Sequence, residues 1–138
     1  MQRLDMVKVK EGVIREYFEA NQDGSIPWVK LAYTGSANSA YQRRLEVASK
    51  PFRRKLNAGV MTEAEAQKLY LSPFCELIIL AWGNVQPEDD GEELPFNTKN
   101  AVEFLGNPEY SPFYEWLQGE AAQLENYRML RQETEAGN

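Results

Sequence analysis

The stretch that decides the fold is VIREYFEANQDGSIPWVKLAYT, residues 13–34. Its two flanks, residues 13–20 and 26–34, are rich in β-branched and aromatic side chains, which is typical of strands. Between them, residues 21–25 combine Asn and Asp, which bond their own backbone, with Gly24, which accepts a positive φ. We therefore predict a β-hairpin, or a three-stranded meander if the alternating Val and Lys of residues 7–10 form a further strand before a turn at Gly12.

From Ser39 onward the apolar residues recur at helical spacing. Pro51 is expected to break or kink the first helix, and Gly59 to stop the segment that follows it. Thr62 and Glu65 form the pattern of a capping box, which predicts a new helix start. The run from Phe74 to Trp82 is apolar on nearly every side, so we predict that it forms the central helix of the core.

Residues 83–96 combine Gly and Pro with clustered carboxylates, which predicts an exposed acidic loop. Asn97 is expected to cap a short helix that ends near Gly106. A last helix is predicted to start at Ser111 with a proline in its first turn and to present apolar residues as far as residue 130. Gly119 in its middle predicts a bend or a close approach of another segment.

These elements predict an α+β protein that is mostly helical. The chain has 138 residues, of which 43% are hydrophobic and 26% charged, which is typical of one globular domain over residues 1–138. We expect a β-hairpin or three-stranded meander in residues 1–35 and four to five α-helices in residues 36–131. Residues 132–138 are expected to fray because they hold little apolar side chain.

The composition excludes most catalytic and metal-binding chemistry. The chain has no histidine and one cysteine, so the usual zinc sites, Ser-His-Asp triads and Cys-His dyads cannot form. Cys75 lies in an apolar run, where we expect it to pack in the core. Residues 21–25 lack the ligand spacing of a calcium loop. We therefore expect no enzyme activity, no metal and no cofactor.

Charge is distributed unevenly along the chain. Residues 1–85 hold 12 basic and 9 acidic side chains, whereas residues 86–138 hold 3 basic and 12 acidic ones. The basic cluster around Arg43, Arg44, Arg53 and Arg54 is compatible with a solvated helix face, with a protein contact or with binding to nucleic acid. Nucleic acid is disfavoured because no aromatic side chains alternate with these cations. The longest apolar run is too short to span a bilayer, and residues 1–10 have no secretory signal pattern.

A family resemblance begins at the end of the apolar run. It consists of WGNV at residues 82–85, DGEELPF at residues 90–96, NAV at residues 100–102, and a final helix rich in Phe and Tyr. In this order, these features resemble the tail assembly chaperones of long-tailed (siphovirus-type) bacteriophages. The resemblance extends over residues 11–130 and is most specific in residues 82–108.

The resemblance implies a binding role in tail morphogenesis. Such chaperones associate with the tape-measure protein, bring tail-tube subunits to it in the host bacterial cytoplasm, and are absent from the finished particle. The opposed charges are also compatible with a homo-oligomer. We expect the following residues to contact protein: Arg43, Arg44, Arg53, Arg54, Trp82, Asp89, Asp90, Glu92, Glu93, Pro95 and Phe96. For Trp82, Pro95 and Phe96, the alternative is that they anchor the core or the loop.

A different class of phage protein is the alternative hypothesis. A small acidic inhibitor can mimic nucleic acid and occupy a basic groove on a host protein. Mimicry needs carboxylates spread over one face, whereas the clustered acids here, Asp89, Asp90, Glu92 and Glu93, lie in one predicted loop. Neutralising these four side chains is expected to abolish mimicry but only to weaken a chaperone contact.

Overall fold

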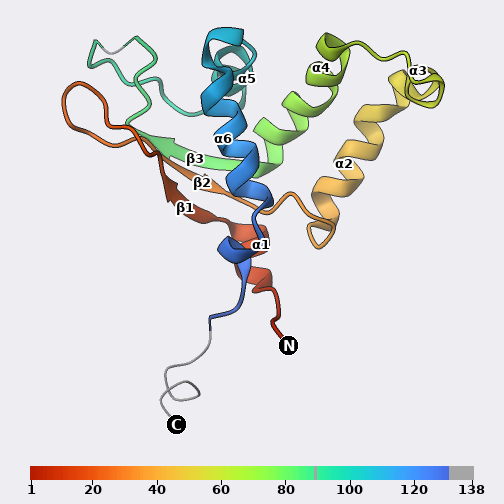
Figure 1. Ribbon diagram of the computed structural model, residues 1–138, viewed down its shortest axis with the longest axis horizontal. Helices are drawn as coiled ribbons and strands as arrows, with labels where there is room; N and C mark the ends of the chain where they lie inside the picture. Colours follow the sequence, from red (N-terminus) through yellow and green to blue (C-terminus); the bar gives the residue numbers. More distant parts are fainter. Residues whose placement is uncertain (89, 131–138) are drawn as a thin grey trace.

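The computed structural model describes residues 1–88 and 90–130 and has the predicted α+β architecture, mostly helical (Figure 1). The strands are β1 (Val13–Glu16), β2 (Trp28–Leu31) and β3 (Ile79–Gly83). The α-helices are α1 (Met6–Glu11), α2 (Ser39–Ser49), α3 (Arg53–Ala58), α4 (Glu63–Pro73), α5 (Thr98–Leu105) and α6 (Ser111–Ala122). Shorter helical turns are Lys50–Phe52, the π-helical turn Phe74–Ile78, Pro108–Tyr110 and Leu124–Tyr127.

The predicted hairpin is present and shorter than expected. β1 and β2 pair antiparallel, with Val13 opposite Leu31 at one end of the register. The turn forms as its sequence indicates, because the Asp23 carboxylate accepts a hydrogen bond from the backbone N–H of Ser25 at 2.9 Å. The backbone N–H of Asn21 also donates to the carbonyl of Ser25 at 2.8 Å. Gly24 adopts a φ of +87°, a conformation that disfavours residues with a side chain.

The predicted central helix over residues 74–82 is wrong in its second half. Helical backbone continues only to Ile78, and the chain then extends as β3, which pairs antiparallel with β2 and places Trp82 opposite Val29. A short apolar run fits a buried helix and a buried strand equally well. Here it completes the sheet in the order β1-β2-β3, so the third strand comes from the middle of the chain.

Residues 7–10, whose alternating Val and Lys predict a strand, lie instead in helix α1. The carboxylate of Asp5 accepts hydrogen bonds from the backbone N–H groups of Val7 and Lys8, at 3.0 and 3.4 Å, and so caps α1. Val9 is then fully buried, where it packs with Tyr33 and Tyr127. A local cap together with this burial outweighs the period-two pattern of a four-residue segment.

The predicted helix boundaries in the middle of the chain are confirmed. Pro51 lies in the short turn that separates α2 from α3, and Gly59 ends α3 with a φ of +68°. Both reciprocal bonds of the capping box between Thr62 and Glu65 are present at the start of α4. The Asn97 side chain caps α5, as expected.

The last helix is shorter than predicted. α6 ends at Ala122, and a 3₁₀ turn, Leu124–Tyr127, follows it. Gly119 has open space around it, so the predicted close approach is wrong. The expected fraying tail, residues 132–138, lies outside the described residues.

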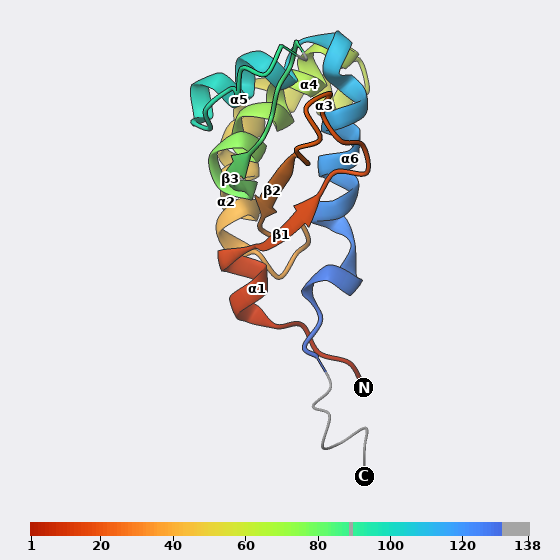
Figure 2. The same ribbon diagram turned by 90° about the vertical axis from the view of Figure 1, so that its left-hand side faces the viewer.

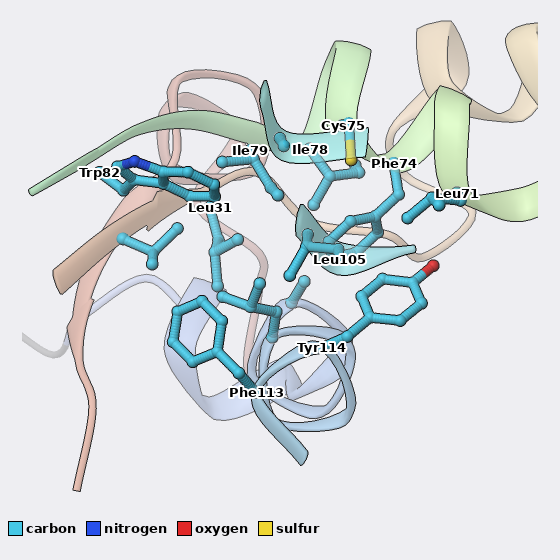
Figure 3. Close-up of a cluster of buried hydrophobic side chains, with 14 of the residues drawn as sticks. Leu31, Leu71, Phe74, Cys75, Ile78, Ile79, Trp82, Leu105, Phe113 and Tyr114 are labelled. Carbon is cyan, nitrogen blue, oxygen red and sulfur yellow. The ribbon is translucent and has the colours of Figure 1, made fainter. Parts of the chain in front are cut away.

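The core lies between one face of the sheet and the helices that follow it (Figure 3). Leu31 and Ile79 point from the sheet toward Leu105 of α5 and Phe113 of α6. Cys75 is fully buried there, as predicted, and burial raises the pKa of its thiol to about 12. The opposite face of the sheet stays more open, since Ile14 is largely exposed on it.

Candidate functional site

An aromatic cleft opens where the far end of the β1–β2 hairpin meets α5 and α6. It has a volume of about 250 Å³. The loop after β3 contributes a third wall through Val85, Gln86 and Pro87. We define the aromatic cleft by its lining residues, which are Tyr17, Glu19, Ala20, Asn21, Pro27, Val85, Gln86, Pro87, Phe104, Glu109, Tyr110, Pro112 and Phe113.

The rings around the cleft form a continuous network. Tyr17 meets Phe113 edge to face, with ring centroids 5.1 Å apart, and meets Trp116 at the same separation. Phe104 links the two sides, since its ring lies 4.4 Å from Tyr110 and 6.0 Å from Phe113. Edge-to-face and tilted pairs at these distances are favourable beyond the area that they bury. The cleft therefore has a rigid apolar wall.

Local sequence chemistry positions the α5–α6 side of the cleft. The Asn107 side chain accepts a hydrogen bond from the backbone N–H of Glu109 at 3.0 Å and so starts the turn Pro108–Tyr110. Pro112 then occupies the first turn of α6, where the missing N–H of proline costs nothing. The Tyr110 hydroxyl donates to the carbonyl of Pro87 at 3.3 Å, which ties this side to the loop after β3.

Hydrogen bonds join the hairpin turn to the same loop. The Asn21 amide donates to the Asn84 carbonyl at 2.7 Å, and the Asn84 amide donates to the Ile26 carbonyl at 3.1 Å. Asp23 accepts from the Gln86 amide at 3.0 Å. These bonds to Asp23, from Gln86 and then from Ser25, lower the pKa of its carboxyl to about 2. The turn and the loop are therefore held as one unit.

The mouth of the cleft is acidic and carries an exposed ring. Glu19 and Glu109 are both exposed, and neither forms an ion pair within the described part of the chain. Burial, and then the neighbouring Glu19 carboxylate, raise the pKa of the Tyr17 hydroxyl. Phe18 is 78% exposed, with its ring 4.4 Å from that of Tyr17.

The acidic loop, residues 84–96, is anchored by side chains that the sequence marked as contact candidates. Trp82 is only 6% exposed, and its Nε1–H donates to the Leu94 carbonyl at 2.8 Å. Phe96 packs edge to face on the Trp82 ring at 5.1 Å. Glu93 accepts from the backbone N–H of Asn84 at 2.7 Å. The structure therefore uses these three side chains to hold the loop against β3.

The other candidates in this loop face solvent. Asp90 accepts from the backbone N–H of Glu92 at 2.9 Å, and both residues are exposed. Pro95 is also exposed, between Leu94 and Phe96, which both contact Trp82. Asp89 lies outside the described residues.

The basic candidates lie on a separate arm formed by α2 and α3. Arg43, Arg53 and Arg54 are exposed, whereas Arg44 pairs with Glu76 through two bonds of 2.8 and 3.1 Å. That hydrogen-bonded pairing raises the pKa of the Arg44 guanidinium. We call the exposed set, Arg43, Lys50, Arg53 and Arg54, the basic arm. Figures 1 and 2 place it away from the acidic loop, at the far side of the molecule.

The structure thus separates the predicted contact residues into two surfaces and adds a third feature, the aromatic cleft. Sequence reasoning missed the cleft because its walls come from segments about ninety positions apart, such as Tyr17 and Tyr110. One available signal was Tyr17-Phe18, since neighbouring residues of a strand point to opposite faces and one of these two rings had to face outward. Another was the pair of prolines that flank Tyr110, at Pro108 and Pro112.

A wider groove lies between α4 and α6. Its volume is about 760 Å³, and its walls are mostly small or polar, including Ala64, Gln67 and Gln118.

The described residues contain no group of three or more Cys, Asp or Glu side chains arranged to hold a metal ion. Within the same residues, no helix combines the length and the apolar character needed to cross a membrane.

The comparisons with known proteins point to a phage. No curated protein and no solved structure matches the chain. A family model described as YdaY prophage protein matches residues 36–138, which is well over half of the sequence. The matched residues include the basic arm, β3, the acidic loop and the α5–α6 side of the aromatic cleft. The chain therefore belongs to the YdaY prophage protein family and is of bacteriophage origin.

Proposed function

We propose that this protein is a non-enzymatic tail assembly chaperone that binds tape-measure and tail-tube proteins in the host bacterial cytoplasm. The observation that supports the proposal is the phage family match, which gives the phage origin. The tail role comes from the resemblance of residues 82–108 to tail assembly chaperones. Phage origin also makes proteins of the same particle available as partners. The family match gives only the phage origin, and the identification of tail proteins as the partners is what we add to it.

The arrangement of the surfaces supports a role in bringing two proteins together. The basic arm and the acidic loop lie on different sides of the molecule, so one molecule can contact two partners at once (Figure 1). Exposed apolar side chains accompany the cations of the arm, since Val47 and Leu56 are exposed on α2 and α3. Apolar anchors with a charged rim suit contacts that form and release. An assembly factor that leaves the finished particle needs such reversible contacts.

Co-expression tests the proposal. The chain is expressed with the tail-tube protein encoded beside its gene, affinity purified, and its mass measured by light scattering at low and high salt. A soluble complex that weakens as salt rises is expected, because charges outside the buried contact act within a Debye length of roughly 8–10 Å. The tape-measure protein is tested in the same way. If neither protein co-purifies at low salt, the proposal is wrong.

Matched variants connect the complex to the surfaces. Reversing charge on the arm with Arg53→Glu and Arg54→Glu is expected to weaken capture of at least one of the two proteins. Reversal at other exposed lysines, Lys10→Glu and Lys68→Glu, is the control for net charge and is expected to leave capture unchanged. An equal loss of capture in the arm variant and in the control variant would show that net charge, rather than the arm, governs binding.

A further inference from the structure

The aromatic cleft is hollow although its walls are tightly paired. Tyr17, Phe104 and Phe113 already contact one another through Phe113, and about 250 Å³ remains open beside these rings, bounded on its other sides by Pro27 and Pro87. Sites for drug-sized ligands usually enclose about 300–1,000 Å³, so this hollow suits one or two amino-acid side chains better than a cofactor. The lining is mixed, and its aromatic and proline part favours a large apolar side chain as the occupant.

The charges around the cleft determine which residues can flank the inserted side chain. The described charged residues of the lining, Glu19 and Glu109, are both carboxylates. Pro87 also lines a second hollow of about 270 Å³, where the described charges are again carboxylates, including Glu88 and Glu92. A phosphate backbone or an acidic segment is repelled here. Lysine or arginine is attracted, and its cation can also lie against the tyrosine rings of the wall.

We propose that the aromatic cleft binds a segment of a partner protein in which a large apolar side chain is flanked by lysine or arginine. The apolar side chain enters the hollow against the wall formed by Tyr17, Phe104 and Phe113, and the cations pair with Glu19 and Glu109. The inference rests on the proposed function only for the identity of the protein that supplies the segment.

The test uses labelled synthetic peptides and the intact protein. One peptide carries a Leu-Phe pair flanked by lysines, a second carries the same pair flanked by glutamates, and a third carries a Ser-Ser pair flanked by lysines. Fluorescence anisotropy measures affinity, and backbone amide NMR shifts locate the site. The first peptide is expected to bind about tenfold more tightly than either of the others, with shifts at the cleft.

Variants separate the cleft from general attraction. Ala20→Trp fills the hollow from an exposed position and is expected to abolish binding of the first peptide without removing any wall. Glu19→Lys with Glu109→Lys is expected to weaken that binding about tenfold. The control, Glu11→Lys with Glu46→Lys, makes the same charge change at exposed positions away from the cleft and is expected to have little effect.

Each outcome bears on the inference separately from the proposed function. Equal binding of the three peptides, shifts outside the cleft, or full binding by Ala20→Trp would overturn the inference. Capture of tail proteins that Ala20→Trp leaves intact would overturn it as well, while the chaperone proposal would stand. If the first peptide binds at the cleft but no tail protein is captured, the inference holds and the chaperone proposal fails.

Discussion

Trp82 offers the sharpest test of how the acidic loop is held. Its indole is buried in β3, and its Nε1–H donates to the Leu94 carbonyl at 2.8 Å across the base of the loop. Phe96 packs on the same ring. The substitution Trp82→Phe keeps an aromatic ring in the core but removes the only donor of that side chain and part of its volume. We expect it to loosen the loop without unfolding the protein.

The expected decrease in the free energy of unfolding follows from the lost hydrogen bond and from the lost side-chain volume. A net hydrogen bond contributes about 0.5–1.5 kcal/mol, and the Leu94 carbonyl, which is half-buried, loses that partner. Truncating a buried aromatic side chain to alanine costs about 3–5 kcal/mol, and replacement by phenylalanine leaves a smaller void. We therefore expect the free energy of unfolding to fall by about 2–3 kcal/mol, which remains below the total of about 5–15 kcal/mol typical of a domain.

Urea denaturation measures the loss, and amide hydrogen exchange locates it. Faster exchange is expected in residues 84–96, since their attachment to β3 is weakened. Trp28→Phe is the matched control, because Trp28 is half-buried on the same sheet and its indole makes no hydrogen bond within the described residues. An unchanged unfolding free energy for Trp82→Phe, with loss of tail-protein capture, would refute the anchoring account and identify Trp82 as a partner contact.

Three further predictions concern local chemistry. The pKa of Asp23 is lowered to about 2, so its hydrogen bonds stabilise the fold above pH 3.8 and this contribution is lost as pH falls through about 2; a carbon NMR titration checks the midpoint, and Asp23→Asn removes the dependence. Thr62→Ala breaks the capping box and is expected to cost about 1 kcal/mol in thermal unfolding, whereas a loss below about 0.3 kcal/mol would count against the cap. Cys75 is buried with a pKa of about 12, so iodoacetamide is expected to label it at neutral pH only in denaturant; rapid labelling of the native protein would contradict its burial.

Features governed by neighbouring residues could be predicted from the sequence. The turn at residues 21–25, the capping box at Thr62 and the cap at Asn97 each depend on side chains within four positions of the backbone groups that they bond. The stop at Gly59 is equally local, because it requires only a residue that tolerates a positive φ.

Features that depend on distant partners could not be predicted in this way. Ile79–Gly83 becomes a strand because β2, fifty positions earlier, offers an unpaired edge. The aromatic cleft needs the hairpin, the loop after β3 and α6 to converge, which no local pattern encodes. The sequence is compatible with Trp82 as an anchor or as a contact, and only the position of the Leu94 carbonyl reveals its hydrogen bond.

The central claim is that this phage protein binds the proteins of tail assembly, and capture of the tail-tube protein tests it most directly. The account predicts a soluble complex at low salt, with a light-scattering mass equal to a whole number of each chain, that dissociates as salt rises. Reversing the charge of the basic arm or filling the aromatic cleft with Ala20→Trp is expected to weaken it. Failure of both the tail-tube and the tape-measure protein to co-purify with the folded chain at low salt would contradict the account.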